Sequence, residues 1–259
     1  MGHFMIVSKI NQLEEHLKLA KEFEVSFELN DFFEPDILDD EIKLNEVIEL
    51  YKKSVMPDNI TMHGAFYDLA IFSRDKKIRD ISYFRMEQCM EIAVKLGVKG
   101  IVFHTNYNSK LSDEVYNNYF ISSTSDFLKS LLEKYSDINI YIENMFDTTP
   151  FILKEISDNL KDYNNFGVCF DWAHAIIYGK SIDIEEWIRI LRDYIKHIHI
   201  NDNDLVNDLH LPVGSGKIDW NLFAKCYEKY FKEHTILIET NEPDDQKRSL
   251  EFLKNLLNI

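Results

Sequence analysis

Cysteine is scarce in this sequence, and long apolar runs are missing. The three cysteines, Cys89, Cys169 and Cys226, are odd in number and far apart, which argues against a disulfide framework or a CxxC zinc site. We therefore interpret them as small buried hydrophobic side chains. A membrane span needs about 18 consecutive apolar residues, and the sequence has no such run. The start, MGHFMIVSKINQLEEHLKLA, lacks the basic head and long apolar centre of a signal peptide. We expect a soluble, intracellular protein of the cytoplasm.

Positive charge is also in short supply. Lys and Arg total 29 against 45 Asp and Glu, which leaves a formal net charge of −16 at pH 7. A field of this sign repels nucleic acid and anionic membranes unless bound cations or a local basic patch reverse it. We therefore expect no membrane partner, and the charge disfavours a nucleic-acid partner.

What the sequence does contain is a regular alternation of short β-prone runs and amphipathic helical stretches. We predict strands at residues 4–8, 25–29, 59–63, 99–104, 138–143, 166–171, 196–200 and 235–240. Helices are predicted after them, at residues 11–23, 44–51, 78–96, 116–135, 149–160, 184–194, 221–231 and 246–257. These units, without a long linker or compositional break, predict a single (β/α)8 TIM barrel domain over residues 1–259. An open doubly wound sheet is the alternative, but no glycine-rich phosphate fingerprint follows the first strand.

Ionisable side chains recur where the predicted strands end. The active sites of such barrels lie at the carboxyl ends of the strands. From the third strand onward these ends hold His63, His104, Glu143, Asp171 with His174 just beyond, His199 and Glu239. A lone histidine is often a hydrogen-bonded structural residue, but consecutive strands with such ends need another explanation. Converging carboxylates repel one another unless cations share them, and imidazole with carboxylate is the ligand mix of Zn²⁺, Mn²⁺ or Fe²⁺.

Residues 196–220, KHIHINDNDLVNDLHLPVGSGKIDW, are interpreted as one wall of this metal site. Strand alternation places His197 and His199 on one face and the isoleucines on the other. Asp208 and His210 stand two apart and offer a second ligand pair before the GSG turn. Asp219 is a predicted N-cap of the next helix. The alternative is a surface loop rich in Asn and Asp.

Several other residues have both a functional and a structural interpretation. We interpret His197 as a packing residue or one that supports a ligand. Three histidines on termini or helix flanks are expected to be solvated, namely His3, His16 and His234. Trp172 and Trp220 either wall a pocket or fill the layer between helices and strands, and Phe66 and Tyr67 either stack on a sugar ring or belong to a lid. The glycine turn either receives a phosphate or is a plain turn.

The motifs around these positions resemble one known group of proteins. They are HGAF at His63, FHTN at His104, IEN at Glu143, FDWAH at Asp171 and His174, HIND at His199, DLH before PVGSG, and IET at Glu239. In combination they look like the xylose isomerase-like barrel superfamily. That superfamily contains sugar isomerases and epimerases together with DNA-repair enzymes of the endonuclease IV type. The resemblance covers nearly the whole chain.

The resemblance implies two alternative sets of metal ligands. For an isomerase or epimerase it implies one divalent ion, held by Glu143, Asp171, His199 and Glu239, with the two glutamates moving protons at adjacent sugar carbons. For the endonuclease type it implies three ions. The first would be held by His63, His104 and Glu143, the second by the same four residues as above, and the third by His174, Asp208 and His210. All nine positions hold a matching residue type.

Two departures from these family patterns affect the ranking. The loop at residues 30–36, NDFFEPD, is acidic, whereas phosphate contacts to DNA need Lys or Arg. The ketose epimerases usually carry an arginine shortly after the histidine of strand seven, where this chain has Asn203, Asp204 and Leu205. We rank first a metal-dependent isomerase or epimerase of a small sugar or sugar phosphate, with Glu143 and Glu239 as the acid–base pair.

Two other hypotheses follow in the ranking. The alternative enzyme is an endonuclease IV-like multi-metal phosphodiesterase, since several metal ions suit phosphoryl chemistry. The third hypothesis is a metal-binding regulatory or storage protein that keeps the barrel without turnover. In each case the expected cofactors are divalent ions, one to three per chain, of Zn²⁺, Mn²⁺ or Fe²⁺.

Overall fold

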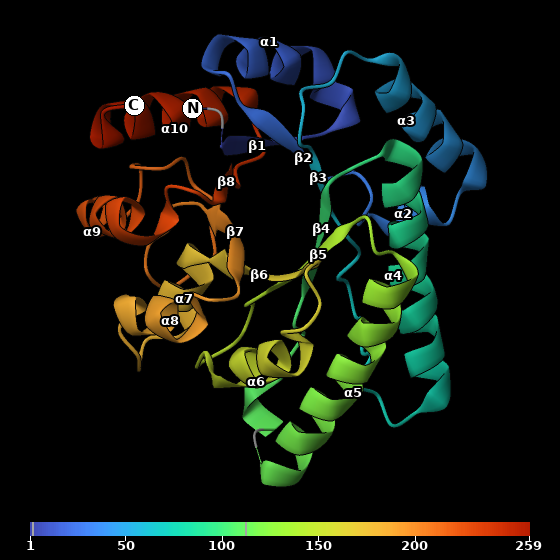
Figure 1. The fold of residues 1–259 in the computed structure, drawn as a ribbon. Helices are drawn as coiled ribbons and strands as arrows, with labels where there is room; N and C mark the ends of the chain where they lie inside the picture. The colour runs from blue at the N-terminus through green and yellow to red at the C-terminus, as the bar shows by residue number, and fades with distance from the viewer. Residues whose placement is uncertain (2, 112) are drawn as a thin grey trace.

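Eight parallel strands form one closed barrel in the computed structural model, which describes residues 1, 3–111 and 113–259 (Figure 1). The strands are β1 (Phe4–Ser8), β2 (Ser26–Leu29), β3 (Thr61–His63), β4 (Gly100–His104), β5 (Asn139–Glu143), β6 (Phe166–Asp171), β7 (Ile195–Ile200) and β8 (Thr235–Ile238). Each strand pairs with its sequence neighbours, and β1 closes the barrel against β8. The predicted (β/α)8 barrel is confirmed.

Helices cover the outside of this barrel (Figure 1). The α-helices are α1 (Leu13–Phe23), α2 (Pro35–Leu38), α3 (Glu41–Lys53), α4 (Lys76–Leu96), α5 (Glu114–Lys134), α6 (Phe151–Leu160), α7 (Trp172–Tyr178), α8 (Ile184–Leu191), α9 (Trp220–Cys226) and α10 (Pro243–Leu257). Short turns of other helix types are the 3-10 turns η1 (Ile10–Gln12) and η2 (Ser109–Leu111) and the π-helical turn η3 (Tyr227–Phe231). The described helices are all too short or too polar to cross a membrane.

The helices differ from their predictions in two ways. The predicted helix at residues 221–231 divides into α9 and η3, and Asp219 caps its start as predicted. Helices α2 and α7 were not predicted, because elements this short show no helical periodicity. Pro35 suits the first turn of α2, and the Asp171 side chain caps α7 by accepting from the His174 amide at 2.5 Å.

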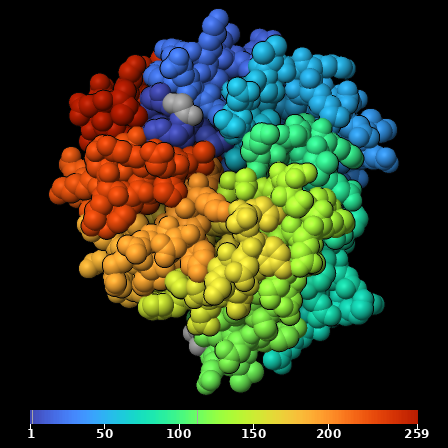
Figure 2. Space-filling model, in the orientation of Figure 1, coloured from blue at the N-terminus to red at the C-terminus, as the bar shows by residue number. Residues whose placement is uncertain are grey.

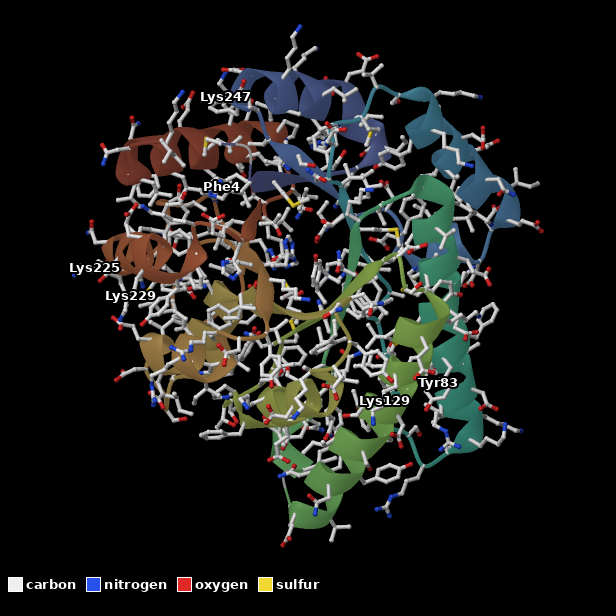
Figure 3. The ribbon with its side chains drawn as sticks, viewed as in Figure 1. Phe4, Tyr83, Lys129, Lys225, Lys229 and Lys247 are labelled. Carbon is white, nitrogen blue, oxygen red and sulfur yellow. The ribbon has the colours of Figure 1, made fainter. Side chains whose placement is uncertain are left out.

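The main core lies between the strands and the surrounding helices. Phe4 points into this packed layer, whereas Lys225 and Lys229 point away from it (Figure 3). Trp172 and Trp220 both belong to this layer, so they fill space between helices and strands. All three cysteines are buried, as predicted.

The inside of the barrel has its own packing. One apolar cluster there joins Met5, Val7 and Leu237, and another joins Val102, Tyr141 and Cys169. Side chains fill the spaces between the ribbons on the face shown in Figure 2. A filled barrel can hold polar groups firmly at its mouth, because their backbones cannot shift without disturbing this packing.

Candidate metal centre

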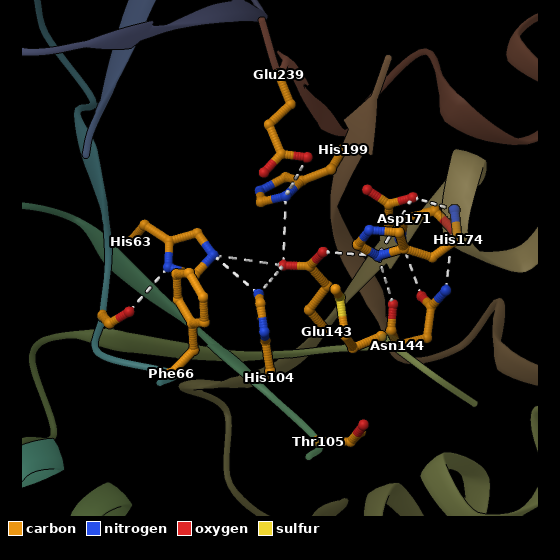
Figure 4. Close-up of polar contacts among 12 residues, drawn as sticks. His63, Phe66, His104, Thr105, Glu143, Asn144, Asp171, His174, His199 and Glu239 are labelled. Atoms are coloured by element: carbon orange, nitrogen blue, oxygen red, sulfur yellow. Dashed lines mark hydrogen bonds and ion pairs between the residues drawn. The ribbon is translucent and has the colours of Figure 1, made fainter. Parts of the chain in front are cut away.

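The nine predicted ligands converge at the carboxyl ends of β3 to β8, and Figure 4 shows seven of them. The last residues of β3, β4, β5 and β6 are His63, His104, Glu143 and Asp171. His199 lies near the end of β7 and Glu239 directly follows β8, while His174 lies in α7, and Asp208 and His210 lie in the loop after β7. Ligand atoms come within 4.8 Å of one another in three groups: His63, His104 and Glu143; Glu143, Asp171, His199 and Glu239; and His174, Asp208 and His210.

The first group joins two imidazoles to one carboxylate. The Nε2 atoms of His63 and His104 lie 3.2 Å apart, and they lie 3.7 and 3.5 Å from Oε2 of Glu143. His63 Nδ1 lies 2.8 Å from the Gly64 carbonyl oxygen, so Nδ1–H donates there and Nε2 keeps its lone pair. Phe66 stacks on His104 with ring centroids 4.6 Å apart. Both imidazoles are therefore held with Nε2 toward the carboxylate.

The second group shares Glu143 with the first. His199 Nδ1 lies 3.4 Å from Glu143 Oε2 and 3.7 Å from Glu239 Oε2. The ends of β5 and β6 are fixed by Asn144, whose side-chain amide donates to the Asp171 carbonyl and accepts from the Asp171 amide, both at 2.9 Å. This double hydrogen bond holds Asp171 beside Glu143.

The third group is formed by α7 and the loop after β7. Asp208 Oδ2 lies 3.1 Å from His174 Nε2 and 3.2 Å from His210 Nε2. The Nδ1 atoms of these histidines lie 3.0 Å from the carbonyl oxygens of Asn144 and Glu239 respectively. Both Nδ1–H groups can donate to carbonyls, so both Nε2 atoms face Asp208 and would be free to bind a metal ion once they lose their protons.

The shifted pKa values of the ligand side chains reflect the high density of negative charge in the site. Burial raises the pKa of Asp171 to about 8, with His174 opposing the shift and neighbouring carboxylates adding to it. Burial lowers the pKa of His210, but Glu239 and Asp208 raise it to about 10 overall. Protons therefore compensate the carboxylates when the protein groups act alone, and divalent cations would replace those protons.

Buried polar atoms without a hydrogen bond give an independent test of whether metal fits. Such atoms among the predicted ligands are both oxygens of Glu143, Asp171 Oδ2, both ring nitrogens of His199, Asp208 Oδ1 and Glu239 Oε2, and of these His199 Nε2 faces Glu28. Each buried polar atom that lacks a partner costs roughly 1–3 kcal/mol. Their convergence on three small volumes is explained if a bound cation satisfies them. The residues present therefore fit divalent metal ions.

Two supporting residues were missed in the sequence. Glu28 in β2 is fully buried and contacts both His197 and His199. A carboxylate in the short apolar run SFEL was the available signal. Asp202 accepts hydrogen bonds from the Trp220 indole and from the Gly214, Ile218 and Asn203 amides. It thereby anchors the loop that carries Asp208 and His210. Three of these partners lie 12 to 18 residues further along the chain.

Other interpretations are decided by burial and hydrogen bonds. The expectation that His16 is solvated is wrong, because His16 is fully buried on the face of α1 that packs on the barrel. His3 and His234 are half-buried. The glycine turn is a plain turn: the Gly214 amide donates to Asp202 and the Ser215 amide donates to the Pro212 carbonyl.

A cleft adjoins the first group at the barrel mouth. It has a volume of about 940 Å³ and reaches His104. Aromatic side chains form much of its wall, namely Phe66, Tyr67, Tyr107, Phe146 and Tyr178. Among the described lining residues, Lys110 is the single lysine, and no arginine is present. The cleft therefore offers a substrate several ring faces and little positive charge besides that of bound metal.

Comparison with known proteins identifies the family. The profile of the xylose isomerase-like TIM barrel family matches residues 20–256. The chain belongs to this family. It is 32% identical over 202 residues to uncharacterised protein MJ1614 of Methanocaldococcus jannaschii, covering 76% of this chain and 77% of that protein. It is 27% identical over 237 residues to "Probable endonuclease 4" of Mycoplasmopsis agalactiae, covering 83% and 81%.

The chain is also similar to a solved structure of an epimerase-like protein. The crystal structure of a D-tagatose 3-epimerase-like protein superposes with a TM-score of 0.76 at 25% identity, covering 99% of this chain and 97% of that one. The xylose isomerase-like family thus has both epimerase-like and endonuclease IV-like relatives of this chain. Its members are mostly enzymes, and they bind divalent metals.

Proposed function

We propose that this member of the xylose isomerase-like family is a multi-metal phosphoesterase that acts on a small phosphate ester. The observation that carries the proposal is the surroundings of Glu143. Its carboxylate is fully buried and lies 3.2–3.7 Å from nitrogens of His63, His104, His174 and His199. A carboxylate enclosed in this way is suited to bridge two metal ions. It is poorly placed to take a proton from a substrate carbon, as an isomerase would require.

The third group supports the same proposal. An isomerase that uses one ion has no need of a preformed cluster of His174, Asp208 and His210. Bound divalent ions would supply Lewis acidity for phosphoryl oxygens and activation of a water. The protein side chains that can meet the substrate lie on the open side, because the side chains of Glu239, Asp208 and His210 are 13%, 14% and 30% exposed. These residues would orient the ester, while the buried ligands keep the charges in place.

Charge and space support a small substrate. The net charge of −16 opposes the approach of a long polyanion. The adjoining cleft of about 940 Å³ is large enough for a small molecule. Lys110 is the single lysine of its described wall and could pair with one phosphate charge.

The second candidate is the isomerase or epimerase that we ranked first from sequence. It is favoured by the D-tagatose 3-epimerase-like neighbour and by the group of Glu143, Asp171, His199 and Glu239, which matches the ligand set that the resemblance implies for one ion. In that case Glu143 and Glu239 would be the acid–base pair. The enclosure of Glu143 by imidazoles places this candidate second.

One panel of reactions tests the order. The purified protein would be assayed with Mn²⁺, Co²⁺ or Zn²⁺ on bis-p-nitrophenyl phosphate and nucleotide-sized phosphodiesters. The same panel would include a duplex with an abasic site, and sugars and sugar phosphates in deuterated water. We expect metal-dependent release of alcohol from the small esters and no carbon-bound deuterium. Glu143→Gln should abolish this activity, whereas Glu242→Gln, on the surface, should preserve it. Deuterium incorporation into a sugar without ester cleavage would reverse the order.

A further inference from the structure

Glu28 occupies the side of His199 that faces away from the proposed metal. Its carboxylate is fully buried, and Oε1 lies 3.3 Å from His199 Nε2. Oε2 lies 3.3 Å from His197 Nε2 and accepts a hydrogen bond from the Thr61 hydroxyl at 2.9 Å. Glu28 and Thr61 are register partners in β2 and β3, while the histidines belong to β7. One carboxylate thus links two separated parts of the barrel wall through its interior.

One arrangement of protons places a donor opposite each oxygen of Glu28. The Thr235 hydroxyl lies 2.6 Å from His197 Nδ1. If that hydroxyl donates to His197 rather than to the Lys196 carbonyl oxygen 3.4 Å away, His197 carries its proton on Nε2, 3.3 Å from Glu28 Oε2. With its proton on Nε2, His199 faces the other oxygen of Glu28 at 3.3 Å. The lone pair of His199 Nδ1 then faces Glu143 and Glu239, at 3.4 and 3.7 Å from their oxygens.

We propose that Glu28 is a positioning residue, which holds His199 as its Nε2–H tautomer and directs Nδ1 toward the divalent ion of the second group. The inference rests on the metal binding in the proposed function but is independent of which reaction is catalysed. A carboxylate behind a ligating imidazole fixes the orientation of the ring and makes the ligating nitrogen more basic. Thr61 orients the carboxylate in turn, because its hydroxyl donates to the second oxygen, and His197 Nε2 lies beside that oxygen.

The first test needs no substitution. In wild-type protein labelled with ¹⁵N at histidine and loaded with Zn²⁺, the ring nitrogen shifts of His199 report which nitrogen carries the proton and which binds the ion. The proposal requires a protonated Nε2 and a metal-bound Nδ1. A proton on Nδ1, with the ion on Nε2 or absent from His199, would overturn it. The His199→Gln variant assigns the signals, and the result stands even if Glu28 variants fail to fold.

The second test measures metal affinity without turnover. Cobalt binding is followed by its visible spectrum in competition with a chromophoric chelator, and His199→Gln identifies the binding step that involves His199. Glu28→Gln keeps the shape but replaces one acceptor oxygen by a donor, so this step should weaken by roughly 10–100-fold. Thr61→Val is the matched control, since it removes one hydrogen bond and leaves the carboxylate, and its effect should be much smaller.

Two results of the cobalt experiment would contradict the proposal. Unchanged affinity in folded Glu28→Gln would show that His199 needs no support from this carboxylate. A thiolate-to-cobalt band that disappears in Cys169→Ala would show that an ion binds between Cys169, His197 and His199, which also lie close enough to hold one. Failure of the phosphoesterase assay would leave both measurements valid, because neither uses a substrate.

Discussion

At the scale of single residues, Asp208 and His210 determine whether the site can hold three ions or fewer. Their side chains form a ligand group with His174, and they belong to neither of the other two groups. Replacing both by alanine should therefore reduce the number of divalent ions bound per chain while the ion of Glu143, Asp171, His199 and Glu239 remains. Elemental analysis after gel filtration is the measurement.

The matched control for this double variant is Asp204→Ala. Asp204 lies in the same loop and is half-buried, and its carboxylate accepts from the Val206 and Asn207 amides and the Asn207 side chain. This control should leave the metal content unchanged. Equal metal content in the double variant and wild type would show that Asp208 and His210 are not ligands.

The residues that the sequence revealed are those whose chemistry is visible locally. His63, His104, Glu143 and Asp171 stand at the ends of apolar runs, so alternation and the barrel rule were enough to bring them together. Glu28 was missed because its partners His197 and His199 are far away in the chain. The sequence alone also could not decide between a metal-bridging and a proton-transferring role for Glu143. That choice depends on four imidazoles that come from different elements.

At the scale of elements, α1 carries a buried titratable group. His16 lies against Phe27, and its Nδ1 accepts weakly from the Lys9 amide at 3.4 Å. Burial lowers the pKa of His16 to about 4 from its usual 6.5. Between pH 6.5 and about 4, His16 therefore binds a proton in the unfolded chain but not in the folded chain. Stability should fall by up to ~1.4 kcal/mol per pH unit as the pH drops toward about 4.

The comparison of wild type with His16→Leu isolates this contribution from α1. Urea unfolding at pH 7.5 and pH 5, both in excess chelator, gives the free energy of unfolding for each protein. The loss of stability between the two pH values should be smaller in His16→Leu. Equal losses would mean that His16 titrates normally in the folded protein. Chelator is needed because acid also releases metal from histidines.

The sequence predicted the element boundaries where apolar residues recur at regular spacing. It did not predict the structure of segments that lack such a pattern. Long helices such as α4 and α5 show their apolar faces clearly. The loop after β7 has no such pattern, since its shape depends on the buried carboxylate of Asp202 and on four donors up to residue 220. Its conformation is a tertiary property that no local propensity encodes.

At the scale of the whole molecule, the proposed metal ions join most of the barrel wall. Ligands come from the ends of β3, β4, β5 and β6, from β7, and from the residue after β8. Ions that bind only the folded state stabilise it by roughly 2.7 kcal/mol per site at a hundredfold excess over Kd. For a chain of this length, that corresponds to a rise in Tm of about 5–10 °C per site. Removal of metal by chelator should therefore lower the Tm, and Zn²⁺ or Mn²⁺ should restore it.

Calorimetric scans in chelator and in excess Zn²⁺ measure this difference. Glu143→Gln should lose most of the metal-dependent rise, because Glu143 belongs to two of the three groups. Glu242→Gln should keep the full rise, since Glu242 is exposed and its side chain pairs with Gln12. A wild-type Tm that is the same in chelator and in metal would mean that the clustered carboxylates and imidazoles are satisfied by protons alone. The assignment of a metal centre would then be wrong, whichever reaction the protein catalyses.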